Sequence, residues 1–131
     1  MLFKSYAPLI LLASIVAFIG CGSGSPIVNY NNSPIQAAAG KKNQKNIRRA
    51  IILAGTSTGW QMREVSQGMI VATRFSSGRM AKVDIKYTTE SFNITYKDSS
   101  NFHYDGTNIH KTYNSWVKQL HKTIANNISK M

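Results

Sequence analysis

Hydrophobic and polar positions alternate with a period of two through the middle of the chain. In residues 81–88 and 92–97 every second side chain is hydrophobic, and the side chains between them are polar or basic. This pattern predicts an antiparallel hairpin with one buried and one solvated face. Residues 60–63 and 70–73, on either side of the turn signal Ser66-Gln67-Gly68, indicate another hairpin, whose alternation leaves its facing open.

Before and after these four segments, hydrophobic residues recur at the spacing of a helix. The first predicted helix begins near Asn43, has basic residues opposite its hydrophobic positions, and meets Gly55, which is placed to end it. The second predicted helix follows Asn108, a candidate N-cap, and has Lys residues opposite its hydrophobic stripe. The hydrophobic positions are Ile47, Ala50, Ile51 and Ala54 in the first helix, and Ile109, Tyr113, Trp116, Val117, Leu120, Ile124 and Ile128 in the second. The order α-β-β-β-β-α predicts an α+β fold: a four-stranded antiparallel sheet with two helices packed on one face.

The N-terminal segment has the architecture of a signal peptide. Lys4 forms a basic start, an apolar run follows from Ala7 to Ile19, and small residues come after it. The alternatives are an uncut signal anchor and a buried core helix. The apolar run is shorter than the about 20 residues that a spanning helix needs, and Pro8 together with the following Gly/Ser run disfavours a core helix.

Residues 17–21, Ala-Phe-Ile-Gly-Cys, resemble a lipobox, the processing site of bacterial lipoproteins. The resemblance implies that the chain is cut before Cys21, that the thiol of Cys21 carries a diacylglycerol, and that Gly22 favours the outer membrane. We therefore expect a signal peptide in residues 1–20, a lipidated Cys21 with a flexible tether in 21–42, and a basic α+β domain in 43–131. The expected location is the outer membrane, to which the lipid anchors the protein, with the periplasmic face favoured over the cell surface.

Several spaced motifs between Ile47 and Ile128 resemble a family of small envelope lipoproteins of Gram-negative bacteria that has no assigned activity. The motifs are Gly59-Trp60, Gly68 with Ile70 and Ala72, Val83-x-Ile85-x-Tyr87, Ile94-x-Tyr96-x-Asp98-Ser99-x-Asn101-Phe102-x-Tyr104, Ile109-His110, Tyr113-Asn114 and Trp116. The resemblance implies an envelope lipoprotein with an α/β sandwich, and it implies no catalytic residue.

The chain is strongly basic, with 16 Lys and Arg residues against five Asp and Glu residues and a formal net charge of +11. Such a charge favours anionic partners. Lys82, Lys86 and Lys97 fall on the solvated face of the predicted sheet and form the candidate contact surface. In the envelope the candidate partners are lipopolysaccharide, anionic lipid or an envelope protein, although the basic residues could equally be a solvated surface. Nucleic acid is not expected as a partner, because export would remove the protein from it.

Residues for catalysis or metal binding are scattered. Cys21 is the single cysteine, so no thiolate cluster can form. His103, Asp105 and His110 are close in sequence, but His121 lies about 16 Å along the helix from His110. We therefore expect no metal site and no cofactor.

Asp98, Ser99 and Asn101 form a candidate binding loop between the last strand and the second helix. The alternative is that these side chains make turn hydrogen bonds to their own backbone. The leading hypothesis is a non-enzymatic, lipid-anchored envelope protein that contacts an anionic component or a protein partner. The alternatives are a small hydrolase-like enzyme that uses the Asp98–His110 region and a structural subunit of an envelope complex.

Overall fold

The computed structural model describes residues 24–131. The predicted signal peptide and Cys21 lie outside the described residues. Within residues 24–131, no helix is both long and apolar enough to cross a membrane.

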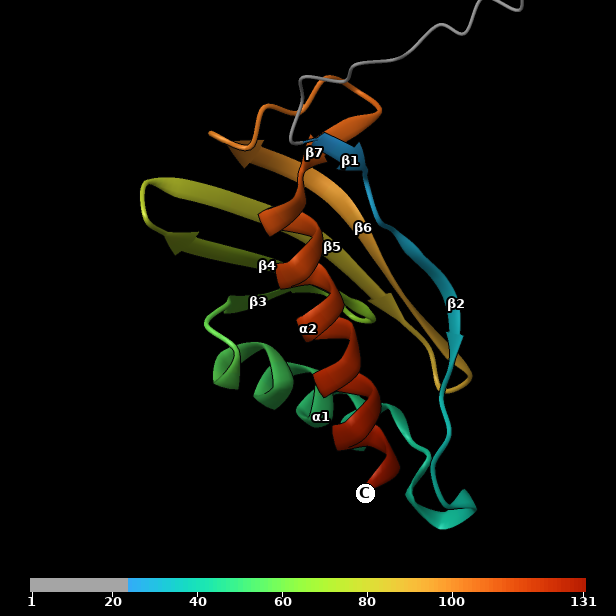
Figure 1. Cartoon of the computed structure of the whole chain (residues 1–131). Helices are drawn as coiled ribbons and strands as arrows, with labels where there is room; N and C mark the ends of the chain where they lie inside the picture. The colour runs from blue at the N-terminus through green and yellow to red at the C-terminus, as the bar shows by residue number, and fades with distance from the viewer. Residues whose placement is uncertain (1–23) are drawn as a thin grey trace, which may run out of the picture.

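The fold is α+β and is built on a five-stranded antiparallel sheet (Figure 1). The strand order across this sheet is β2-β6-β5-β4-β3, and a small second sheet pairs β1 with β7. The strands are β1 (Gly24–Pro26), β2 (Tyr30–Pro34), β3 (Gln61–Ser66), β4 (Met69–Ser76), β5 (Arg79–Tyr87), β6 (Ser91–Ser100) and β7 (Asn108–His110). The four predicted strands are present as β3–β6, and the sheet has a fifth strand, β2, that the pattern did not reveal.

Two helices, α1 (Gln44–Ser57) and α2 (Lys111–Ser129), cover one face of the five-stranded sheet (Figure 1). Asn43 caps α1, and its side chain accepts a hydrogen bond from the Asn46 N–H at 2.9 Å. Asn108 does not cap α2 as predicted, because it lies in β7. The imidazole of His110 caps the helix instead, accepting from the Thr112 N–H at 3.1 Å.

Gly55 does not end α1. The helix continues to Ser57, and Gly55 is buried at a close approach to the Met62 side chain of β3. A glycine selected for close packing looks the same in the sequence as one selected for a helix end.

The hydrophobic core lies between the helices and the sheet. Its members include the predicted inward positions of β5 and β6 and most of the predicted helical stripes. In the β3–β4 hairpin the structure settles the facing, because Ile70 and Ala72 point into this core. Val71 points to the opposite side of the sheet.

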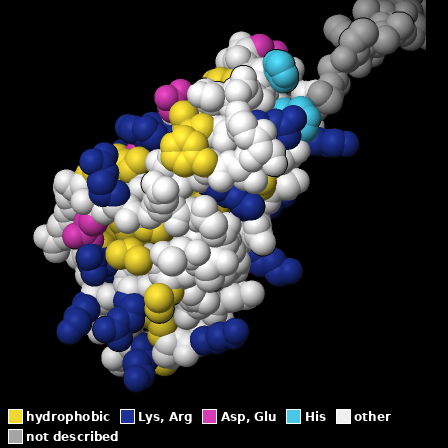
Figure 2. Space-filling view, turned by 90° about the vertical axis from the view of Figure 1, so that its left-hand side faces the viewer, with side chains coloured by type: hydrophobic (Ala, Val, Ile, Leu, Met, Phe, Trp, Pro, Cys, Tyr) yellow, Lys and Arg dark blue, Asp and Glu magenta, His cyan; other side chains and the backbone are white. Residues whose placement is uncertain are grey.

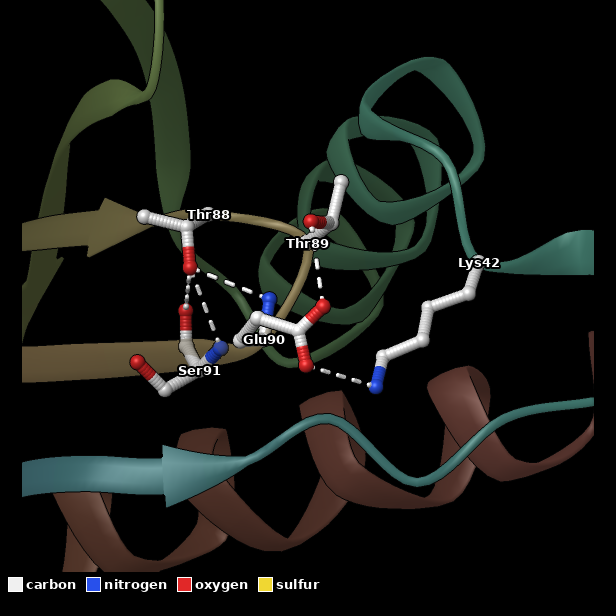
Figure 3. A network of polar contacts seen from close by, with 5 residues as sticks. All are labelled: Lys42, Thr88, Thr89, Glu90 and Ser91. Carbon is white, nitrogen blue, oxygen red and sulfur yellow. Dashed lines mark hydrogen bonds and ion pairs between the residues drawn. The ribbon is translucent and has the colours of Figure 1, made fainter. Parts of the chain in front are cut away.

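Most of the segment expected to be a flexible tether is folded. Residues 24–42 contain β1, β2 and the 3-10 helix η1 (Ala39–Lys41), and Ile35 reaches the core with only 4% of its surface exposed. The Ile35 N–H donates to the Glu90 carbonyl at 2.9 Å, and Lys42 forms an ion pair with Glu90 at 3.0 Å (Figure 3). These long-range contacts hold a segment that has no periodic pattern of its own.

Candidate functional site

The candidate surface is the face of β3–β6 turned away from the helices, here called the open sheet face. On β5, Ala81, Val83 and Ile85 are buried against the helices, so Lys82 and Lys86 project from the opposite face. Lys97 of β6 joins them through its ion pair with Asp84 of the same face, at 3.6 Å. The structure thus brings the three lysines predicted from the sequence onto one surface.

Arg63 of β3 adds a fourth cation to the open sheet face, which the ambiguous pattern of that hairpin had hidden. It lies opposite Val71 in the strand register and is exposed. Two carboxylates lie on this face, those of Asp84 and Asp98. Asp98 is paired with Lys82 in the strand register, next to a register shift between β5 and β6. Cations therefore outnumber carboxylates on this surface.

Glu64 does not offset this charge, because it points to the helix side. There it pairs with Arg48 of α1 and accepts a hydrogen bond from the Tyr87 hydroxyl at 3.3 Å. Burial and the neighbouring Glu64 carboxylate raise the pKa of Tyr87 above its ordinary value. The Tyr87 hydroxyl is therefore a hydrogen-bond donor at neutral pH.

The open sheet face also has an apolar part. Phe75 is 64% exposed, whereas Val71 is only 7% exposed and lies at the base of a shallow hollow of about 280 Å³. Phe75, Arg63 and Lys82 border this hollow. Figure 2 views the molecule from the side of β3 and the β4–β5 turn, at right angles to Figure 1, and shows hydrophobic side chains among many Lys and Arg side chains there. Such a surface can hold an anionic group beside an apolar one.

The predicted loop of Asp98, Ser99 and Asn101 is mostly strand. β6 continues to Ser100, so Asp98 and Ser99 lie within it, and the Ser99 hydroxyl is 2.9 Å from the Tyr96 hydroxyl. Asn101 has a positive φ of 62° and its side-chain amide donates to the Gly78 carbonyl at 2.6 Å. Asn101 thus joins the end of β6 to the β4–β5 turn.

Asp105 and His110 have different hydrogen-bond partners, although His103 lies near His110. The Asp105 carboxylate accepts from the Thr107 and Asn108 N–H groups, which lowers its pKa. His110 caps α2 and His103 is exposed. In the described part of the chain, no group of three or more His, Cys, Asp or Glu side chains could hold a metal ion.

A contact that sequence reasoning missed joins β2 to α2. The His121 ring stacks on Tyr30 with 3.8 Å between ring centroids, and His121 Nε2 lies 2.9 Å from the Ser33 hydroxyl oxygen. Burial lowers the pKa of His121 below its ordinary value. No local signal could have revealed this contact, because 88 residues separate Ser33 from His121.

Comparisons of the chain with protein-family models, with curated proteins and with solved structures found no match.

Proposed function

We propose that this protein is a non-enzymatic lipoprotein of the bacterial envelope, of the family that its motifs resemble. In this proposal Cys21 carries the lipid that anchors it to the outer membrane, with the domain on the periplasmic side. The open sheet face contacts an anionic component of the envelope.

The start of the folded domain supports a close attachment to the membrane. Gly24 is paired with His110 in the β1–β7 sheet, so only Gly22 and Ser23 separate the folded chain from Cys21. Such a linker spans at most about 11 Å between the Cα atoms of residues 21 and 24. We propose that the domain is held against its membrane by the β1–β7 end.

The observation that carries the contact proposal is the composition of the open sheet face. The open sheet face carries Arg63, Lys82, Lys86 and Lys97, and the exposed Phe75 lies beside the first two of them. One of the two carboxylates on this face is already paired with Lys97. Each basic residue near an anionic lipid surface contributes about 1 kcal/mol. An exposed aromatic side chain adds apolar contact with acyl chains or sugar rings.

The anchor is tested by the intact mass of the protein extracted from membranes, compared with its Cys21→Ser variant. We expect a wild-type product that begins at Cys21 and carries acyl mass, and no such product from the variant. An unmodified full-length wild-type mass would refute the anchor.

The contact is tested with the full lipoprotein and mixed micelles of neutral detergent and the anionic lipid phosphatidylglycerol, at low and high salt. The test variant is the triple substitution Lys82→Gln, Lys86→Gln and Lys97→Gln. The control removes the same charge from the helices, with Lys45→Gln, Lys111→Gln and Lys118→Gln. We expect salt-sensitive binding that falls at least about tenfold in the test variant and less in the control. Equal losses in both variants would show that only the total charge matters.

A further inference from the structure

A second basic region lies where α1 meets the C-terminal end of α2, on the helix side of the molecule (Figure 1). A pocket of about 380 Å³ opens there between the two helices and η1. Its volume lies within the range of small-molecule sites in proteins.

Three cations line this pocket: Lys41 of η1, Arg49 of α1, and Lys130 just after α2. Among residues 24–131, none of the three takes part in an ion pair. Their neighbours Lys42 and Arg48 are paired with Glu90 and Glu64. No Asp or Glu side chain lines the pocket, so it is suited to an anion.

Two asparagines add hydrogen-bond acceptors to the pocket. The Asn46 side-chain amide donates to the Lys41 carbonyl at 3.0 Å, and that of Asn127 donates to the Ala50 carbonyl at 3.2 Å. These bonds fix both amide groups, and each Oδ1 has no hydrogen bond within residues 24–131. Both oxygens can therefore accept from hydroxyl groups of a ligand.

An apolar wall completes the pocket. Leu53 of α1 lines it with 56% of its surface exposed, and Met131, which is partly buried against the core, also lines it. A pocket with cations, fixed acceptors and an apolar wall suits a ligand with a negative charge, hydroxyl groups and a carbon ring. We propose that this pocket binds a sugar that carries a phosphate or a carboxylate.

The position of the pocket favours a sugar over a lipid headgroup, an argument that rests on the proposed anchor. The start of α2 follows β7, which pairs with β1, whereas the pocket lies at the end of this 19-residue helix, about 28 Å away. A domain attached at its β1–β7 end turns this pocket away from the membrane. A headgroup of the anchoring leaflet would not reach it.

Calorimetry measures the binding of four probes, three sugars and inorganic phosphate, to the full chain in neutral detergent. The sugars are glucosamine 6-phosphate, N-acetylmuramic acid and neutral N-acetylglucosamine, and inorganic phosphate is added to measure the anion alone. We expect binding of at least one anionic sugar, and its identity tells whether the pocket takes a phosphate or a carboxylate. Arg49→Gln should weaken this binding at least about tenfold, because it removes a charge-assisted contact. Lys118→Gln removes the same charge from an exposed position of α2 outside the pocket and should change binding less than about twofold.

The outcomes separate this proposal from the proposed function. Binding that Arg49→Gln leaves unchanged, equal binding of the neutral sugar, or equal affinity for inorganic phosphate would overturn the sugar site. Binding of phosphatidylglycerol vesicles that is lost in Arg49→Gln, without sugar binding, would make the pocket a headgroup site and also overturn it. A missing lipid on Cys21 would refute the anchor, whereas sugar binding measured by calorimetry would still support the pocket.

Discussion

Gly55 shows how one residue sets the distance between α1 and β3. A Cβ built at this position would lie 2.8 Å from the Met62 Cγ and closer still to its sulfur. The Met62 side chain is partly buried against the core, so a Cβ at position 55 would force it into another rotamer within packed surroundings. The absence of a side chain at Gly55 therefore allows the close packing of α1 on β3.

Substitution of Gly55 by Ala should lower the free energy of unfolding by about 1–3 kcal/mol, because it overpacks this contact. In a Met62→Ala background the clash is absent, and the higher helix propensity of Ala should make the same substitution stabilising by up to about 1 kcal/mol. Urea unfolding of the four proteins measures both values. The same sign in both backgrounds would contradict the packing role of Gly55.

His121 should make stability depend on pH. Burial lowers its pKa in the folded protein below the unfolded value, so the unfolded chain takes up the proton first as the pH falls. The contribution of His121 to the free energy of unfolding is therefore fully present above about pH 6.5, and it is lost as the pH falls from there through the folded pKa. We expect unfolding free energies measured at pH 7.5 and 5.5 to differ more in the wild type than in His121→Gln.

The control for this comparison is internal. His110 also has a lowered pKa, through partial desolvation and the nearby Arg79, His103 and Lys111, and it contributes in the same direction in both proteins. The difference between wild type and variant thus isolates His121. An equal pH dependence in the two proteins would show that His121 is not the group responsible.

At the scale of elements, the sequence predicted those whose burial follows a regular period. β5 and β6 alternate because one face meets the core and the other meets solvent, and the stripe of α2 follows its contact with the sheet. β2 could not be predicted in this way, because its register shifts between Tyr30 and Ser33. Its place at the sheet edge depends on side chains of β6 and α2 that are distant in sequence.

The candidate surface shows the same division. The regular alternation of β5 and β6 assigned Lys82, Lys86 and Lys97 to the solvated face. Arg63 could not be assigned in this way, because the sequence did not show which side of β3 faces the core. The pocket between α1 and α2 was not predicted, because it depends on how the ends of two helices meet. Local patterns give the side of an element that faces solvent, but they do not give which elements converge.

Asn114 of α2 is the buried link between this helix and the N-terminal strands. Its side chain accepts from the Val28 N–H at 3.0 Å and donates to the Pro26 carbonyl at 2.9 Å. Asn114→Ala should lower the free energy of unfolding by about 1–3 kcal/mol, because it leaves these backbone groups without partners. Hydrogen exchange should accelerate most in residues 24–34.

The matched control for this prediction is Asn126→Ala, an exposed asparagine on the same helix. It should leave both stability and exchange in residues 24–34 close to those of the wild type. Equal exchange in Asn114→Ala and in the control would mean that other contacts hold the N-terminal strands.

At the scale of the whole molecule, the two basic regions have different positions relative to the proposed anchor. The open sheet face runs along the domain, whereas the pocket lies at the end of α2 that is distant from β1 (Figure 1). If the β1–β7 end rests on the membrane, the first region extends along the domain away from that end and the second points away from the membrane. One protein could then contact its own leaflet and a component of the periplasm at the same time.

This orientation predicts a gradient of distance from the membrane along the domain. Thr107 lies at the β1–β7 end, where its carbonyl accepts from the Ile27 N–H at 3.0 Å, and Leu53 lies at the pocket. Fluorophores attached to Thr107→Cys and Leu53→Cys in the lipidated protein should transfer energy to acceptor lipids with different efficiencies. The label at position 107 should transfer more, because the length of α2, about 28 Å, separates the two ends. Equal transfer from both positions would mean that the domain tumbles freely on its lipid, and the proposed separation of the two basic regions would then have no fixed direction.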